Sequence, residues 1–402
     1  MKKCILIHYC KIERLFIKFN RGGDYILTAI NDQKRMITLT RNIEYDELIE
    51  LRRREKFYCP QCQEPLLMRI GQVVIPHFAH QKNSKCKGLF SEGETTTHLL
   101  GKQLLYEKFR KLNLNVQLEP YLKELAQRPD LLIEYNAMKY AVEFQCSTIP
   151  IPKMESRTEG YLKEDIIPIW ILQTPKDKQP YRNGIQLLKI SPFKQRFITY
   201  TQDDAHMMTF NPEAESFVYF SHLVPLGGYR FIGNVQHLSL DAQHFPFLTA
   251  KQLSESDFQI YWQLWKQERK LFLSRRLLLS KKGVQDPFLR ACYFLRIQAE
   301  KLPLFIGIPV AKNIHFSVVD AEWQLLWLMF LVEKGEQFTF LSTRTIYEFS
   351  KRYPTLFLNH EAEQSVKNYN FILKNLGITC MQSKFNEKIL LKLLYAQFLA
   401  KR

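Results

Sequence analysis

The sequence predicts a mixed α/β protein with an αβββαβ core, a small cysteine-containing module before it and a mostly α-helical C-terminal region after it. Strand-like runs fill residues 116–172 and are interrupted by a single helix-like segment. Cysteine and histidine residues gather within residues 59–86. Beyond residue 203, long leucine-rich and aromatic runs have helical spacing. A chain of 402 residues, 46% of them hydrophobic, is long enough for two or three such parts.

Changes of pattern divide the chain into four expected segments. Residues 1–24 are expected to be an N-terminal extension, 25–90 a β-stranded metal-binding module, 91–180 the α/β core, and 181–402 the mainly helical region. Within the module, two short strands joined by a turn at Asn31 and Asp32 precede a charged helix.

Charge and hydropathy limit the possible partners and compartments. The formal net charge of +17 favours an anionic partner such as nucleic acid or a membrane surface, because Lys and Arg release condensed counterions on contact. Polar residues interrupt the apolar start before a signal-peptide core is complete, and no run approaches the roughly 20 apolar residues of a spanning helix. The eight cysteines are too scattered for a disulfide framework. We therefore expect a cytoplasmic protein without a membrane partner.

Five potential metal ligands lie in the N-terminal module. Cys59 and Cys62 form a Cys-Pro-Gln-Cys knuckle, and His77, His80 and Cys86 follow at the spacing of a zinc-ribbon-like module. Because side chains alternate along a strand, the two histidines should point to opposite faces. We prefer Cys59, Cys62, His80 and Cys86 as ligands of a structural Zn²⁺, with His77 as the alternate. The opposing interpretation is a redox pair or two buried thiols, with the histidines in a small core.

Two acids and an amide lie on neighbouring strands of the predicted core. Asp130 begins one strand, and the period-two alternation puts Glu143 and Gln145 on one face of the next. A carboxylate in so apolar a strand needs a partner, and a divalent cation would serve. Acids in this order within an αβββαβ arrangement are typical of a restriction-endonuclease-like core, the fold of PD-(D/E)XK nucleases.

Helical spacing adds further polar residues to this constellation. Glu94, His98 and Lys102 fall at i, i+4 and i+8, on one stripe of the preceding helix. Downstream, Arg157 and Tyr161 lie one helical turn apart and could contact a phosphate. The opposing interpretation is a structural ion pair between Glu143 and either Lys102 or Arg157.

The chain resembles a known family in motifs that follow one another in a fixed order. They are CPQC, PHFAH, GETTTHLLGK, QRPDLLIEY, AVEFQCS and SRTEGYLKEDIIPIWIL. With these motifs the chain resembles the competence protein CoiA family, and LPLFIGIPV and EWQLLWL are similar to the helical C-terminal region of that family. The resemblance implies a bacterial cytoplasmic protein that helps to turn incoming single-stranded DNA into recombinants, alongside the recombinase RecA. It also implies the nuclease-like fold.

The resemblance assigns roles to four of the residues named above. Asp130 and Glu143 match the motif acids, Glu94 corresponds to the acid on the first helix, and Gln145 stands where many nucleases of this fold carry Lys. The two motif acids, with the carbonyl of Phe144, would hold Mg²⁺ or Mn²⁺.

The glutamine at the motif position affects the expected rate. Gln145 would orient the attacking water, but it has no charge, and we expect this to cost on the order of a hundredfold in rate. Lys102 or His98 would supply the positive charge instead. The expected activity is metal-dependent phosphodiester hydrolysis of single-stranded or branched DNA. The alternatives are a catalytically weak or inactive DNA clamp of the same fold, and a protein-interaction adaptor.

A basic and aromatic stretch in the helical region is the second expected DNA contact. Trp262, Trp265 and Phe272 alternate there with basic residues, which are Lys266, Arg269, Lys270, Arg275, Arg276, Lys281 and Lys282. Bases of single-stranded DNA stack on aromatic rings while phosphates meet cations. The opposing interpretation is that the rings belong to the core and the basic face is merely solvated.

Overall fold

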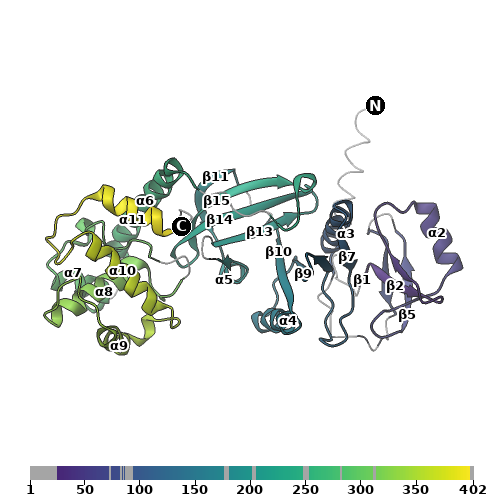
Figure 1. Ribbon diagram of the computed structural model, residues 1–402, viewed down its shortest axis with the longest axis horizontal. Helices are drawn as coiled ribbons and strands as arrows, with labels where there is room; N and C mark the ends of the chain where they lie inside the picture. The colour runs from purple at the N-terminus through teal and green to yellow at the C-terminus, as the bar shows by residue number, and fades with distance from the viewer. Residues whose placement is uncertain are drawn as a thin grey trace, which may run out of the picture. The chain divides into compact units, whose positions relative to one another are not determined.

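The computed structural model describes most of the chain beyond residue 24 (Figure 1). The described residues are 25–71, 74–81, 84, 86, 94–175, 181–201, 205–247, 253–280, 283–310 and 314–398. The expected extension, residues 1–24, and the two lysines at 281 and 282 lie outside them. The chain forms two compact units. Unit 1 first ends at Asp177, close to the expected boundary at residue 180, but it also includes Met208–Val218 and Leu238–Leu248.

Six short antiparallel strands form the sheet of the N-terminal module in unit 1. In spatial order they are β1 (Tyr25–Ile26), β6 (His77–His80), β5 (Pro65–Arg69), β4 (Phe57–Tyr58), β2 (Thr28–Asn31) and β3 (Met36–Thr38). The predicted hairpin is confirmed as β2 and β3, and the predicted charged helix as α2 (Tyr45–Arg54). Ile26, Leu48, Phe57 and Phe78 fill the core of this module.

The α/β core follows in the predicted order of helix, three strands, helix, strand. Its elements are α3 (Thr96–Lys111), β7 (Asn115–Leu118), β8 (Leu131–Tyr135), β9 (Met138–Gln145), α4 (Ile151–Lys163) and β10 (Ile166–Gln173). Strands β7, β8 and β9 are antiparallel neighbours, and β10 runs parallel to β9 after the crossover through α4. A Cβ atom at Gly101 would lie 2.2 Å from the ring of Phe144, so α3 packs directly against β9.

Residues 205–239 correct the expectation that the chain beyond residue 203 is mostly helical. They form three long strands, β13 (Ala205–Asn211), β14 (Ser216–Gly227) and β15 (Arg230–Ser239). In unit 1, β13 pairs with β10 at Leu172 and Thr209, and in unit 2, β15 pairs with β11 (Gly184–Lys189). Most residues of β14 are buried whichever side they point to. A strand with apolar residues on both faces lacks the alternation that marks a half-exposed strand.

Apart from the short α5 (Pro192–Gln195), the described helices of unit 2 begin after residue 253 and confirm the helical character of that part. They are α6 (Glu255–Leu279), α7 (Pro287–Phe294), α8 (Asp320–Glu333), α9 (Thr343–Arg352), α10 (Ala362–Asn375) and α11 (Glu387–Phe398). A capping box at Ser254 and Asp257 starts α6. The core of unit 2 is built around α8, whose Trp323 and Trp327 are fully buried.

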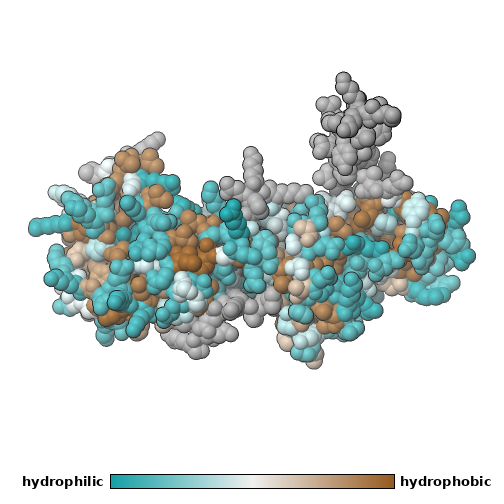
Figure 2. All heavy atoms as spheres, turned by 90° about the horizontal axis from the view of Figure 1, so that it is seen from above, coloured by the Kyte–Doolittle hydropathy of each residue, from teal (hydrophilic) through white to brown (hydrophobic). Residues whose placement is uncertain are grey.

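Hydrophilic side chains cover much of the surface visible in Figure 2, and apolar side chains appear between them as separate patches. Among the helices of the described residues, we find none with the length and apolar character needed to cross a membrane.

Candidate functional site

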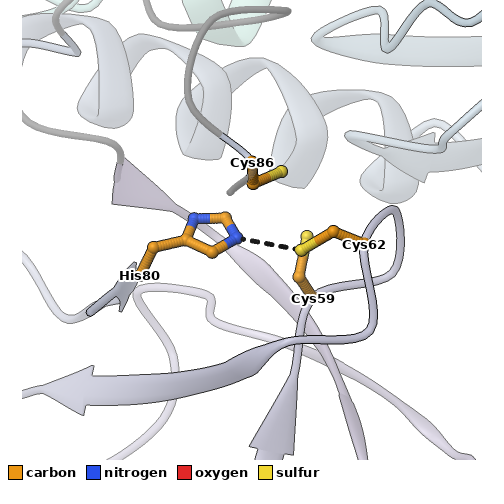
Figure 3. Close-up of side chains that lie close together, drawn as sticks. All are labelled: Cys59, Cys62, His80 and Cys86. Carbon is orange, nitrogen blue, oxygen red and sulfur yellow. Dashed lines mark hydrogen bonds between the residues drawn. The ribbon is translucent and has the colours of Figure 1, made fainter. Parts of the chain in front are cut away.

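Three cysteines and one histidine of the N-terminal module converge on one point (Figure 3). The ligand atoms of Cys59, Cys62, His80 and Cys86 all lie within 4.8 Å of one another. Nε2 of His80 is 3.4 Å from the sulfur of Cys62. Three thiols and one imidazole at this spacing fit a tetrahedral structural Zn²⁺.

Local backbone geometry brings these four residues together. After β4 the chain turns sharply through Gln63, whose φ is +61°, and the Gln63 N–H donates to the Cys59 carbonyl at 2.9 Å. Cys86 arrives from the other side, where its N–H donates to Oγ of Ser84. Burial, together with the two neighbouring thiols, raises the pKa of Cys86 to about 12. A bound cation would reverse this effect, because metal coordination favours the thiolate.

His77, the alternate ligand, lies outside the cluster. It is buried, with 5% of its surface exposed, and its Nδ1 is 2.8 Å from the carbonyl of Ile75. Its ring centroid lies 4.2 Å from that of Tyr25. The structure therefore gives His77 a packing role, as expected for the strand face opposite to His80.

The second group of polar residues surrounds Asp130, which immediately precedes β8. Its Oδ2 accepts hydrogen bonds from the N–H of Phe144, at 2.7 Å, and from Nε2 of His98, at 3.2 Å. Nζ of Lys102 lies 3.8 Å from the other oxygen, Oδ1. Burial acts to raise the pKa of Asp130, but His98, Lys102 and the Phe144 N–H hold that pKa well below its usual range.

The stripe predicted on α3 faces this aspartate. Glu94, just before the helix, lies 2.7 Å from Nζ of Lys102 through Oε1 and 3.1 Å from Nδ1 of His98 through Oε2. Burial opposes both charges, yet the two cations lower the pKa of Glu94 to about 2. Against the same effect of burial, Glu94 and Asp130 raise the pKa of His98 to about 10. His98 is therefore a cation at neutral pH.

Glu143 lies in the middle of the sheet on β9 and is 3% exposed. Its Oε1 accepts hydrogen bonds from Arg157 and from the hydroxyl of Tyr161. Burial raises the pKa of Glu143 to about 7, and the charge of Arg157 opposes this shift only in part. The predicted phosphate ligands thus have a different role here. Tyr161 is fully buried, and Arg157 pairs with Glu143 as the structural ion-pair interpretation expects.

The two motif acids line one small cavity. In the described part of the chain, the hydrogen bonds to Glu143 end on Oε1 and those to Asp130 end on Oδ2. The cavity, of about 30 Å³, is also lined by Gln145, whose Nε2 donates to the Ser147 carbonyl at 2.8 Å. This volume accommodates a water-sized ligand. Two carboxylate oxygens beside it fit the hard oxygen ligands that Mg²⁺ or Mn²⁺ prefers.

Glu119 belongs to this network and was missed by the sequence analysis. It follows β7, is 2% exposed and has a left-handed φ of +49°. That conformation costs a non-glycine residue roughly 1 kcal/mol. Its Oε1 lies 2.5 Å from Nζ of Lys102. The only sequence signal was a glutamate directly after an apolar strand, which is common at strand ends.

The basic residues predicted on α6 have mostly structural partners. Arg269 donates to three backbone carbonyls, those of residues 302, 303 and 306, and Arg276 pairs with Asp286 and Glu322. Lys266 is 3.7 Å from Glu387 and lies over the ring of Trp262. Trp262 and Trp265 are stacked and buried in the core, as the opposing interpretation expected.

Two of the predicted basic residues remain exposed on α6. Lys270 and Arg275 present their side chains to solvent. Arg275, with Arg269 and Arg276, also lines a cavity of about 350 Å³ in unit 2. The basic surface that the described residues of α6 expose is therefore smaller than the sequence suggested.

Comparison with known families finds a match for the α/β core and another for the N-terminal module. A model of the CoiA nuclease-like domain matches residues 94–253, and a model of the CoiA N-terminal domain matches residues 40–88. The chain belongs to the competence protein CoiA family. "Competence protein CoiA" of Bacillus subtilis (strain 168) is 28% identical over 285 residues, which are 70% of this chain and 74% of that protein. No solved structure matches the chain.

The CoiA match also revises the extent of the nuclease-like domain. It continues past the expected boundary at residue 180 and includes β11 to β15. Asp130, Glu143 and the α3 stripe all lie within the residues that match the nuclease-like domain, and the cysteine knuckle lies in the N-terminal match.

Proposed function

We propose that this CoiA family member is a metal-dependent nuclease that acts on single-stranded or branched DNA during recombination after natural transformation. The observation that carries the proposal is the pair of acids, Asp130 and Glu143, which line the same small cavity. Cations surround that cavity, as a site for a phosphodiester requires. From the resemblance to the CoiA family, we further propose that the protein acts alongside RecA in the cytoplasm.

In this proposal, residues that line the cavity have different roles in hydrolysis. A divalent cation held by Asp130 and Glu143 would lower the pKa of a bound water and neutralise charge on the phosphate. Gln145 would orient the attacking water, and its amide is itself fixed by Ser147. His98 is a cation at the edge of the cavity, so it can stabilise negative charge on the phosphate in place of the missing motif lysine.

Cleavage assays with labelled single-stranded and branched DNA in Mn²⁺ test the proposal. We expect Asp130→Asn and Glu143→Gln to lower the cleavage rate by at least about a hundredfold while DNA binding persists. Glu134→Gln is the matched control, because Glu134 is an exposed acid on β8. Circular dichroism spectra and Mn²⁺ titrations of each variant separate lost catalysis from lost folding. Cleavage that survives in both acid variants would contradict the proposal.

A second candidate function is a DNA clamp without cleavage. The observation that favours it is the ion pair that each acid forms within the protein, Asp130 with His98 and Glu143 with Arg157. A wild-type protein that binds DNA in a salt-dependent way but never cuts it, with any divalent metal, would establish this function instead.

For the N-terminal module we propose a structural Zn²⁺ on Cys59, Cys62, His80 and Cys86. Its role would be to hold the knuckle, β6 and the segment carrying Cys86 together, since this module has only a small apolar core. Elemental analysis should find one zinc per chain. A zinc-free preparation whose module keeps its amide protection would refute the proposal.

A further inference from the structure

Glu119 connects the two parts of unit 1 through buried hydrogen bonds. Its Oε2 accepts from the N–H of Leu27, at 2.9 Å, and from the hydroxyl of Thr28, at 3.3 Å. Its Oε1 accepts from Nζ of Lys102, at 2.5 Å. Glu119 thus contacts the N-terminal module with one oxygen and the stripe of α3 with the other.

The contact on the module side is made by well-ordered sheet structure. Leu27 lies between β1 and β2, is fully buried, and its carbonyl accepts from the N–H of Leu39 at 2.8 Å. β1 pairs with β6 through Tyr25 and Ile26. Paired strands therefore flank both groups that donate to Glu119.

The contact on the core side controls a buried charge. Lys102 is 1% exposed, and its ammonium reaches Glu94 at 2.7 Å and Asp130 at 3.8 Å as well as Glu119. An ammonium group can donate three hydrogen bonds. Without Glu119, the charge of Lys102 would act on Glu94 and Asp130 alone among these three acids. Lys102 would then compete more strongly with any cation that these acids attract.

We propose that Glu119 is a positioning residue of the nuclease-like site, and that the N-terminal module completes this site by holding Glu119 in place. Three carboxylates, those of Glu94, Glu119 and Asp130, share Lys102 and His98, so the group keeps the net negative charge that draws in a divalent metal. The left-handed backbone at Glu119 agrees with a position set by these contacts and not by local preference. Only the catalytic consequence of this inference rests on the proposed nuclease function.

The test compares Glu119→Gln with Glu107→Gln in the full-length protein. Glu107, on α3, also accepts a backbone hydrogen bond from the N-terminal segment, from the N–H of Arg41 at 2.8 Å. Each variant loses one negative charge and perturbs a contact between the N-terminal module and the α/β core. Of the two glutamates, Glu119 is the one that contacts Lys102. Thr28→Val is a milder variant that removes one hydrogen bond to Glu119 and keeps the side-chain shape, for use if Glu119→Gln fails to fold.

Two readouts do not require cleavage. Mn²⁺ affinity, measured by calorimetry, should fall by about tenfold or more in Glu119→Gln, as is typical when an outer partner of a metal ligand is lost. Amide exchange of Phe144, whose N–H donates to Asp130, should become faster in the metal-free variant, while exchange in α8 of unit 2 stays unchanged. Glu107→Gln should leave both readouts within about twofold of wild type, and Thr28→Val should lie between the two.

The outcomes separate this inference from the proposed function. If wild type binds Mn²⁺ but does not cut DNA, hydrolysis is refuted, and a weaker Mn²⁺ affinity in Glu119→Gln still supports the positioning role. If wild type binds no Mn²⁺ at all, the exchange of the Phe144 amide decides. Equal behaviour of Glu119→Gln and Glu107→Gln in both readouts would overturn the inference, as would a uniform increase of exchange through both units.

Discussion

Replacing His98 with Gln tests the charge network of the nuclease-like site in metal-free protein. The imidazole lies 3.1 Å from Glu94 and 3.2 Å from Asp130, and these two acids raise its pKa, against the effect of burial, to about 10. A rise from 6.5 corresponds to roughly 5 kcal/mol of native-state stabilisation, at about 1.36 kcal/mol per pKa unit.

The sign of the pH dependence follows from the direction of this shift. Because the pKa of His98 is higher in the folded than in the unfolded state, the stabilisation is fully present below pH 6.5 and is lost as the pH rises through 10. Between about pH 6 and pH 9, wild type should lose about 3 kcal/mol more of its free energy of unfolding than His98→Gln.

Urea denaturation with a chelator present, at several pH values, measures this difference. His244→Gln is the control, since His244 is an exposed histidine of the same unit. A difference in pH dependence below about 1 kcal/mol, or an NMR titration showing neutral His98 at pH 8, would refute the reasoning.

Three further predictions concern the metals and the packing of α3. Cys86→Ser should abolish the expected single zinc while His77→Gln retains it, as elemental analysis of the purified variants will show. Mn²⁺ affinity should fall by about tenfold for each pH unit below 7, because Glu143, with its pKa raised to about 7, must lose its proton to bind metal; a flat calorimetric profile from pH 5 to 7 would contradict this. Gly101→Ala should cost about 1 to 3 kcal/mol in urea denaturation, because its methyl group would collide with the ring of Phe144, and an unchanged stability would show that α3 can shift.

The α/β core was predictable because its strands carry their pattern locally. In β9, Glu143 and Gln145 alternate with the apolar Val142 and Phe144, and the turn at Asn136 and Ala137 separates this strand from β8. The α3 stripe was predictable for the same reason, since residues at i, i+4 and i+8 share a face on any helix. The cysteine knuckle needed only its spacing.

Other features depend on tertiary contacts that no local pattern encodes. Strand β14 has apolar residues on both faces, so its periodicity cannot distinguish a strand buried on both faces from a core helix. The role of Arg269 depends on carbonyls more than 30 residues away, and that of Glu119 on Leu27, 92 positions earlier. The sequence alone does not distinguish a charged residue that faces solvent from one that forms such a long-range contact.

The ion pairs that Asp130 forms with His98 and Glu143 forms with Arg157 affect when the protein would bind its metals. Because His98 and Arg157 already neutralise these acids, this part of the chain can fold, and persist, in a compartment where divalent metal is scarce. Among the residues that the structure describes, the groups that act on the Cys86 thiol are the thiols of Cys59 and Cys62, which raise its pKa. With the metals that we propose, Zn²⁺ would bind the cysteines while the new chain folds. The Mg²⁺ or Mn²⁺ at Asp130 and Glu143 would instead exchange throughout the lifetime of the folded protein, and it could bind only when DNA is present.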